Sequence, residues 1–131
     1  MKDGKNMENL KIESSAYTPE IDFNLNDNSL KILGKSTPEN TFEFFEPVKS
    51  WLSSYFEEPK ECIVTFDIPY FNSSSSRVIY DLFDIFSDAK DSGSNITINW
   101  EYATNNENAE ESGEEFKEDF EDLTINLVSK D

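Results

Sequence analysis

From residue 42 onward, a helix-type repeat of apolar residues is followed by a strand-type repeat three times in succession. Between residues 42 and 56 they recur every three or four positions, which is typical of a helix with one buried face. Across residues 62–68 alternate positions are apolar, and Ile63 makes this stretch apolar on both sides, as in a strand inside a sheet. The same exchange of helix and strand patterns follows at 78–89 and 96–102, and at 105–122 and 124–128. Strands that alternate with helices predict a partly parallel sheet covered by helices.

The first third of the chain predicts strands that run antiparallel. Leu10 and Ile12 indicate a short first strand, and alternating apolar residues across 20–34 indicate a hairpin. Its turn is expected at residues 26–28, because Asn and Asp tolerate a left-handed backbone. The predicted order is therefore βββαβαβαβ, an α/β fold with a mixed central sheet and about three covering helices.

Pro47 interrupts the first helical pattern. A proline inside a helix removes a hydrogen bond and clashes one turn back, at a cost of about 3 kcal/mol. We therefore expect the regular helix to start near Glu46, with residues 38–45 forming a looser first turn.

The composition indicates a small aromatic core inside a very acidic surface. The 131 residues include 28 acids and 11 bases, for a net charge of −17, together with 11 phenylalanines. A disordered acidic chain would lack those rings, so we expect one folded domain at residues 7–131 after a disordered polar tail at 1–6. The negative field repels nucleic acids and anionic membranes, and neither is expected as a partner. Since no apolar run approaches the ~20 residues of a membrane span and no signal peptide opens the chain, a cytoplasmic location is predicted.

Several catalytic chemistries are excluded by the residue types. The chain has no histidine, which rules out Ser-His-Asp and Cys-His catalysis and imidazole metal ligands. Its one cysteine, Cys62, cannot form an internal disulfide or a thiolate zinc site, and its place in a strand pattern predicts a buried, inert thiol. The acidic segment 105–122 fits a solvated helix face better than a cation site or a carboxylate hydrolase. We expect a non-enzymatic protein without a cofactor or a metal.

A run of four serines at 73–76 lies where a predicted buried strand ends and a helix begins. In open α/β sheets this position is the usual place of function. One serine is enough to cap a helix, so the run is either a flexible turn or something more than a cap. A phosphate would be stabilised there by free amides and the helix dipole. Arg77, the sole arginine, follows Ser73 by four residues and is suited to hold that phosphate; its alternative is a surface ion pair with Asp81.

Five segments together resemble the SiaC family of bacterial regulatory phosphoproteins: Thr18-Pro-Glu-Ile-Asp, Pro38-Glu-Asn, Phe42-Glu-Phe-Phe-Glu-Pro-Val, Tyr70-Phe-Asn-Ser-Ser-Ser-Ser and Asn99-Trp-Glu-Tyr. The similarity covers nearly the whole chain from Met7 onward. It implies a STAS-like fold, similar to anti-sigma-factor antagonists, and a partner switch in signal transduction. Family members are phosphorylated by a serine/threonine kinase and dephosphorylated by a PP2C-type phosphatase. The resemblance also implies that the unphosphorylated form binds and activates a GGDEF diguanylate cyclase, which makes c-di-GMP and promotes biofilm formation.

The resemblance also implies which residues form the site. The family's phosphoacceptor follows the asparagine of the Tyr-x-Asn motif, which places it on Ser73, with Ser74 and Ser75 as the alternatives. Asn72, Ser74 and Ser75 are expected to hold the turn and cap the helix, and Arg77 to steady the phosphate. The alternative function is a constitutive acidic adaptor without phosphorylation.

The partner is expected to dock on the surface around residues 70–75 when the serine is unmodified. Further residues that we expect to support partner binding or the phosphosite are Tyr70, Phe71, Pro38, Glu39 and Asn40.

Overall fold

The computed structural model describes residues 7–131, so the predicted tail at 1–6 lies outside the described residues. Its elements follow the predicted order βββαβαβαβ, which is confirmed. The strands are β1 (Leu10–Ile12), β2 (Glu20–Asn24), β3 (Ser29–Leu33), β4 (Glu61–Asp67), β5 (Asn95–Ala103) and β6 (Thr124–Lys130). The helices are α1 (Thr41–Tyr55), α2 (Ser73–Asp91) and α3 (Glu107–Asp119).

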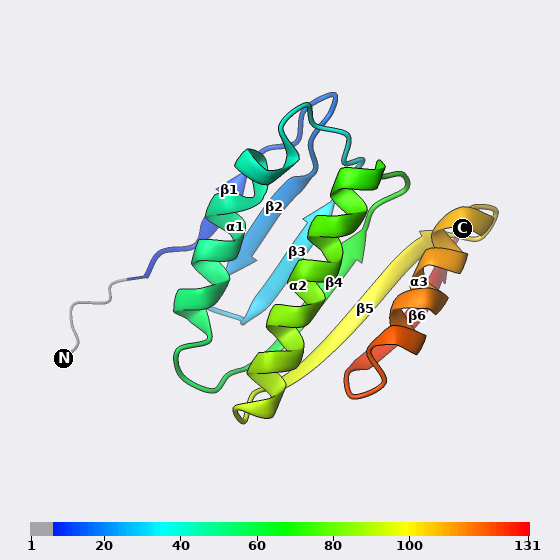
Figure 1. Ribbon diagram of the computed structural model, residues 1–131. Helices are drawn as coiled ribbons and strands as arrows, with labels where there is room; N and C mark the ends of the chain where they lie inside the picture. The colour runs from blue at the N-terminus through cyan, green and yellow to red at the C-terminus, as the bar shows by residue number, and fades with distance from the viewer. Residues whose placement is uncertain (1–6) are drawn as a thin grey trace.

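The six strands form one mixed sheet in the order β1-β2-β3-β4-β5-β6. The pairs β1–β2 and β2–β3 are antiparallel, whereas β3–β4, β4–β5 and β5–β6 are parallel. The turn between β2 and β3 contains Asn28 at φ 52°, the left-handed backbone that the sequence predicts there. Each parallel pair is joined by one helix. Because such crossovers are right-handed and here advance in one direction, all three helices cover the same face of the sheet (Figure 1).

Aromatic rings fill the layer between the helices and the sheet. Phe66 of β4 lies 5.2 Å from Phe83 of α2 and 5.6 Å from Trp100 of β5, measured between ring centroids. Phe116 of α3 lies 4.7 Å from Phe83 and 5.2 Å from Trp100. The predicted phenylalanine-rich core is therefore confirmed, and these rings join the sheet to helices α2 and α3.

Helix α3 approaches β5 and β6 closely at Gly113. A Cβ atom on this residue would lie 2.5 Å from Cδ1 of Trp100 and 2.8 Å from Cδ2 of Leu127. The same tryptophan donates a buried hydrogen bond of 2.9 Å from its Nε1 to the backbone oxygen of Ala109. Trp100 thus sets how closely α3 approaches β5, and its hydrogen bond holds this acidic helix in place on the sheet.

The expected start of the first helix near Glu46 was wrong. Helix α1 begins at Thr41 and contains Pro47. Asn40 caps it by accepting a 3.3 Å hydrogen bond from the Glu43 amide. Thr41 and Phe45 are buried and hold the first turn on the core, while Pro47 is exposed. The bond that this proline removes therefore lies on the solvent side, where its loss is less costly than in the core.

The second face of the sheet carries no helix among the described elements. Strand β4 lies inside the sheet as predicted, but the Ile63 side chain is 52% exposed instead of buried. Lys11 on this face forms ion pairs of 3.1 Å with Glu20 and 3.6 Å with Asp22. Ile63 is exposed because every crossover places its helix on the other face of the sheet.

The lone thiol lies in the core, as expected. Cys62 is buried in β4, and this burial raises its pKa to about 11, so it is protonated at neutral pH. Helices long and apolar enough to cross a membrane do not occur among residues 7–131.

Candidate functional site

The serine run forms the first turn of α2, directly beyond the end of β4. The helix cap is Asn72, whose Oδ1 accepts hydrogen bonds of 2.9 Å from the Ser75 amide and 3.2 Å from the Ser74 hydroxyl. The Ser76 amide donates to the backbone oxygen of Asn72 at 2.9 Å. Capping is therefore performed by the asparagine, and the serine hydroxyls are available for other contacts.

Ser75 is fully buried, and its hydroxyl joins α2 to the segment between β3 and α1. Its Oγ donates to the backbone oxygen of Ser36 at 3.0 Å and lies 2.8 Å from the Ser36 Oγ. Since a hydroxyl has one proton, the Ser36 hydroxyl is the donor in this second bond. Both side chains have zero exposure to solvent, so Ser75 is not accessible as a phosphoacceptor in this conformation.

Ser74 makes a second link between the two segments. Its Oγ lies 2.7 Å from Oγ1 of Thr41, the first residue of α1, and is partly buried. The same hydroxyl donates to Oδ1 of Asn72 at 3.2 Å. The hydroxyl of Ser74 is thus engaged on both sides.

Ser73 differs from its neighbours in accessibility. It is exposed, and no side-chain hydrogen bond within the described part of the chain uses its hydroxyl. Its place at the start of α2 puts it next to backbone amides that have no acceptor within the helix. Among the three predicted acceptors, Ser73 has the hydroxyl with the fewest structural contacts.

The loop before α2 has one anchored aromatic and one free aromatic. Phe71 is partly buried and contacts Trp100 edge-to-face, with the ring centroids 6.3 Å apart. Tyr70 is 59% exposed. The Ser36 amide donates to the Tyr70 backbone oxygen at 2.9 Å, which fixes the loop while the Tyr70 ring faces solvent.

The predicted supporting residues 38–40 divide into two groups. Asn40 caps α1 next to Thr41 and therefore lies in the bonded network. Pro38 is buried and Glu39 is exposed, and both line a shallow pocket with Tyr17 on the other side of this segment. Asn40 thus precedes the residue that bonds Ser74, and the Pro38 backbone oxygen accepts a 3.5 Å hydrogen bond from that same Thr41 hydroxyl.

Arg77 is exposed one helical turn after Ser73, and the suggested ion pair with Asp81 is not formed. Asp81 instead binds Lys49 of α1, with Nζ and Oδ2 3.1 Å apart. Within residues 7–131 no ion pair includes Arg77. The guanidinium is therefore free to bind a negative group near Ser73.

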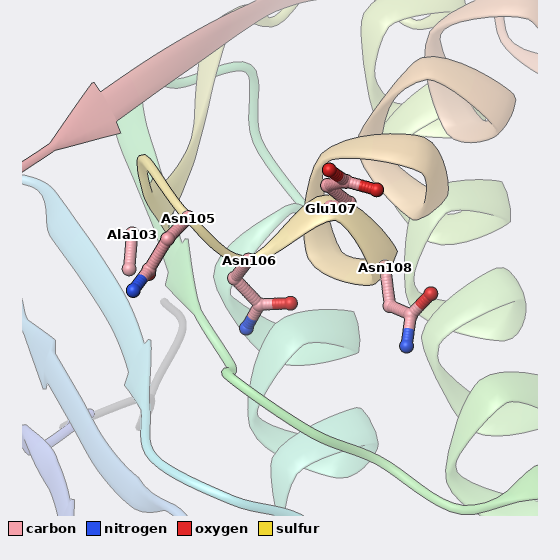
Figure 2. A pocket seen from close by; sticks show the side chains of 5 residues that line it. All are labelled: Ala103, Asn105, Asn106, Glu107 and Asn108. Carbon is pink, nitrogen blue, oxygen red and sulfur yellow. The ribbon is translucent and has the colours of Figure 1, made fainter.

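A polar pocket lies at the start of α3, lined by Ala103, Asn105, Asn106, Glu107 and Asn108 (Figure 2). Asn106 caps α3 through the Ala109 amide at 3.1 Å and donates to the Pro69 backbone oxygen at 3.0 Å. One carboxylate lines it, and residues 7–131 contain no group of three or more His, Cys, Asp or Glu that could hold a metal. The amide of Asn106 thus has a structural function and connects α3 to the loop that precedes the serine run.

Sequence reasoning missed two residues of the site, Ser36 and Thr41. Each lies more than thirty positions from the serine that it contacts, at separations of 39 and 33 residues. Their hydroxyls stand in a stretch that reads as an ordinary helix start. A small polar residue just after a strand, Ser36 after β3, was the available signal.

Comparisons with known proteins agree with this architecture. The family model described as SiaC family regulatory phosphoprotein matches residues 12–130. A protein of Pseudomonas aeruginosa strain UCBPP-PA14 is 30% identical over 114 residues, which cover 86% of this chain and 90% of that protein.

Two solved structures from Pseudomonas aeruginosa are similar over nearly their full length. Apo-SiaC has a TM-score of 0.79 at 25% identity and covers 95% of this chain and 100% of its own. A chain in the complex of the diguanylate cyclase SiaD with its activator SiaC has a TM-score of 0.87 at 27% identity, over 92% of this chain and 99% of that one. On its sequence and its fold, the chain belongs to the SiaC family of regulatory phosphoproteins.

Proposed function

We propose that this chain is a non-catalytic switch in which phosphorylation of Ser73 controls the binding of a GGDEF diguanylate cyclase. The observation that carries the proposal is that neighbouring serines differ in whether their hydroxyls are exposed and free of hydrogen bonds. The hydroxyls of Ser74 and Ser75 are engaged in contacts that hold the fold, whereas that of Ser73 is exposed and without a hydrogen bond in the described chain.

The local electrostatics favour a phosphate at Ser73. The first-turn amides of α2 and the positive end of its dipole stabilise an anion at this position. Arg77 lies on the same outward side of the helix and has no ion pair among the described residues. These groups offset part of the repulsion from a chain with a net charge of −17.

The identity of the partner is supported by the relative of known structure. SiaC of Pseudomonas aeruginosa is the activator of the diguanylate cyclase SiaD, and the chain resembles a chain of that complex at a TM-score of 0.87. We extend this partner class to the present protein. A serine/threonine kinase and a PP2C-type phosphatase, both implied by the family resemblance, would set and reset the switch.

Phosphorylation would act directly on the docking surface. The phosphate adds about 1.5–2 negative charges at pH 7, three positions after the exposed Tyr70. Burying that charge against the partner carries a desolvation cost. A loss of about 3 kcal/mol would lower the affinity by roughly two orders of magnitude.

The alternative function is a constitutive acidic adaptor in which the serines only stabilise the helix. The Asn72 cap weakens this alternative, because it leaves Ser73 without a capping contact. Incubation with the kinase of the same organism and ATP, followed by mass spectrometry, tests the proposal. We expect a gain of about 80 Da, one phosphoryl group, that Ser73→Ala abolishes and Ser76→Ala retains. A chain that gains no mass, or that still gains it as Ser73→Ala, would contradict Ser73 as the acceptor.

A further inference from the structure

We propose that Arg77 binds an acidic side chain of the partner when Ser73 is unmodified, and that phosphate on Ser73 releases the partner by capturing this arginine. The inference rests on the proposed function and goes beyond it: it assigns Arg77 to both states of the switch and predicts the chemistry of the docked segment.

The first observation is that Arg77 has no ionic partner in a chain with a large excess of acids. The acid that helix spacing offers, Asp81, is held by Lys49 at 3.1 Å. No ion pair or side-chain hydrogen bond formed within residues 7–131 engages the Arg77 guanidinium. The α1–α2 ion pair therefore keeps the arginine available.

The second observation is the sign of the protein's charge. A net charge of −17 attracts basic partners, and an added phosphate would strengthen that attraction. Release on phosphorylation therefore requires that the part of the partner over Ser73 is not basic. A carboxylate is the group that fits the flat, two-pronged guanidinium of Arg77.

The exposed Tyr70 ring completes the description of the docked segment. Its ring is 59% exposed, three positions before Ser73, and offers an apolar surface on the loop that leads into α2. We therefore expect the partner to present a carboxylate next to an apolar side chain. The carboxylate pairs with the guanidinium of Arg77, and the apolar side chain packs on the Tyr70 ring.

Phosphorylation converts this intermolecular contact into an intramolecular one. Ser73 and Arg77 are four residues apart on one helix, so their side chains are neighbours. A phosphate carries more charge than a carboxylate and, being attached to the same helix, competes at a high effective concentration. The partner then loses its anchor and faces a charge of its own sign.

Binding measurements on the unmodified protein separate an anchor from a group that only steadies phosphate. The probe is the SiaD-like diguanylate cyclase of the same organism, as a full chain, in isothermal titration calorimetry. We expect Arg77→Gln to weaken binding by about tenfold or more, and Arg77→Lys to weaken it less. The matched control is Lys90→Gln, which removes one exposed cation at the other end of α2 and should leave the affinity unchanged. Circular dichroism melts verify that every variant is folded.

Each outcome distinguishes the inference from the proposed function. Parent-like binding by Arg77→Gln would overturn the anchor, and the proposed function would still stand if Ser73→Asp binds worse. Parent-like binding by Ser73→Asp and by the phosphorylated protein, or no binding of the cyclase by the parent, would overturn the proposed function and the inference with it.

A second measurement tests the capture without any partner. With phosphoserine introduced at position 73, ³¹P NMR titration reports the second phosphate pKa. Arg77 should hold this pKa below that of the Arg77→Gln protein, in which it should return toward about 6. Equal values in the two proteins would show that the phosphate does not engage Arg77 and would overturn the capture step.

Discussion

The hydroxyls of Ser75 and Ser36 lie 2.8 Å apart with no exposure to solvent, and they join the start of α2 to the segment that leads into α1. Together with the 2.7 Å contact between Ser74 and Thr41, this pair holds the start of α2 and the start of α1 side by side, so that they form one continuous surface. Ser73 stands at the edge of that surface. The neighbours of the proposed acceptor are therefore part of its framework.

Removal of the buried hydroxyl should destabilise the protein. In Ser75→Ala the Ser36 hydroxyl loses its acceptor and the Ser36 backbone oxygen loses a donor. We expect a loss of about 1–3 kcal/mol in the free energy of unfolding, measured by urea denaturation. Ser76→Ala, in the same turn, should change it by less than about 0.5 kcal/mol. Equal stability of the two variants would show that the buried pair contributes nothing.

Gly113 should not tolerate even one methyl group. Alanine favours a helix over glycine by about 1 kcal/mol, but its Cβ would lie 2.5 Å from the Trp100 ring. We expect the steric clash to outweigh the gain in helix propensity. The free energy of unfolding should fall by about 1–3 kcal/mol, measured by thermal or urea denaturation. Tryptophan fluorescence would report the displaced ring. The exposed Glu111→Ala on the same helix is the control, and a more stable Gly113→Ala protein would contradict the close packing.

Stability should fall at alkaline pH because of Cys62. Burial raises the pKa of this thiol from its ordinary 9.0 to about 11. Below pH 9 the thiol is neutral in the folded and in the unfolded chain. Between pH 9 and 11 the thiol is deprotonated in the unfolded chain but not in the folded one, so unfolding is favoured as pH rises. Urea midpoints between pH 8 and 11 should fall more steeply for the parent than for Cys62→Ala. Parallel slopes would show that the thiol does not contribute.

The ion pair between α1 and α2 should influence partner binding indirectly. Lys49→Met leaves Asp81 free to pair with Arg77, which lies four residues before it. If Arg77 anchors the partner, we expect the affinity for the diguanylate cyclase to fall severalfold, by titration calorimetry. Adding Asp81→Asn should restore it, since the competing carboxylate is then gone. A loss that persists in the double variant would assign the effect to Lys49 itself.

Most of the fold could be predicted from the sequence because local periodicity determines the elements. The predicted order and the mixed sheet are correct, as is the left-handed backbone at Asn28. Pro47 misled the prediction of the first helix, since tertiary contacts of Thr41 and Phe45 outweigh its local cost. The exposure of Ile63 depends on which face each crossover covers, and apolar spacing does not contain that information.

The site could be predicted only in part for a related reason. The motif identified the serine run and Arg77, and spacing placed them on one helix turn. Which serine is accessible depends on Ser36 and Thr41, which approach from segments distant in sequence. Likewise, the freedom of Arg77 depends on Lys49 of another helix. Long-range pairing of small polar groups leaves no periodic signal in a single sequence.

The central claim is that charge on Ser73 controls docking, and the affinity of the phosphorylated protein tests it most directly. Two homogeneous samples, one unmodified and one with phosphoserine at position 73, are titrated into the same full-length diguanylate cyclase, with Ser73→Ala as the uncharged control. We predict tight binding by the unmodified and alanine proteins and roughly hundredfold weaker binding by the phosphoprotein. Equal affinities of the unmodified and phosphorylated samples would contradict the account.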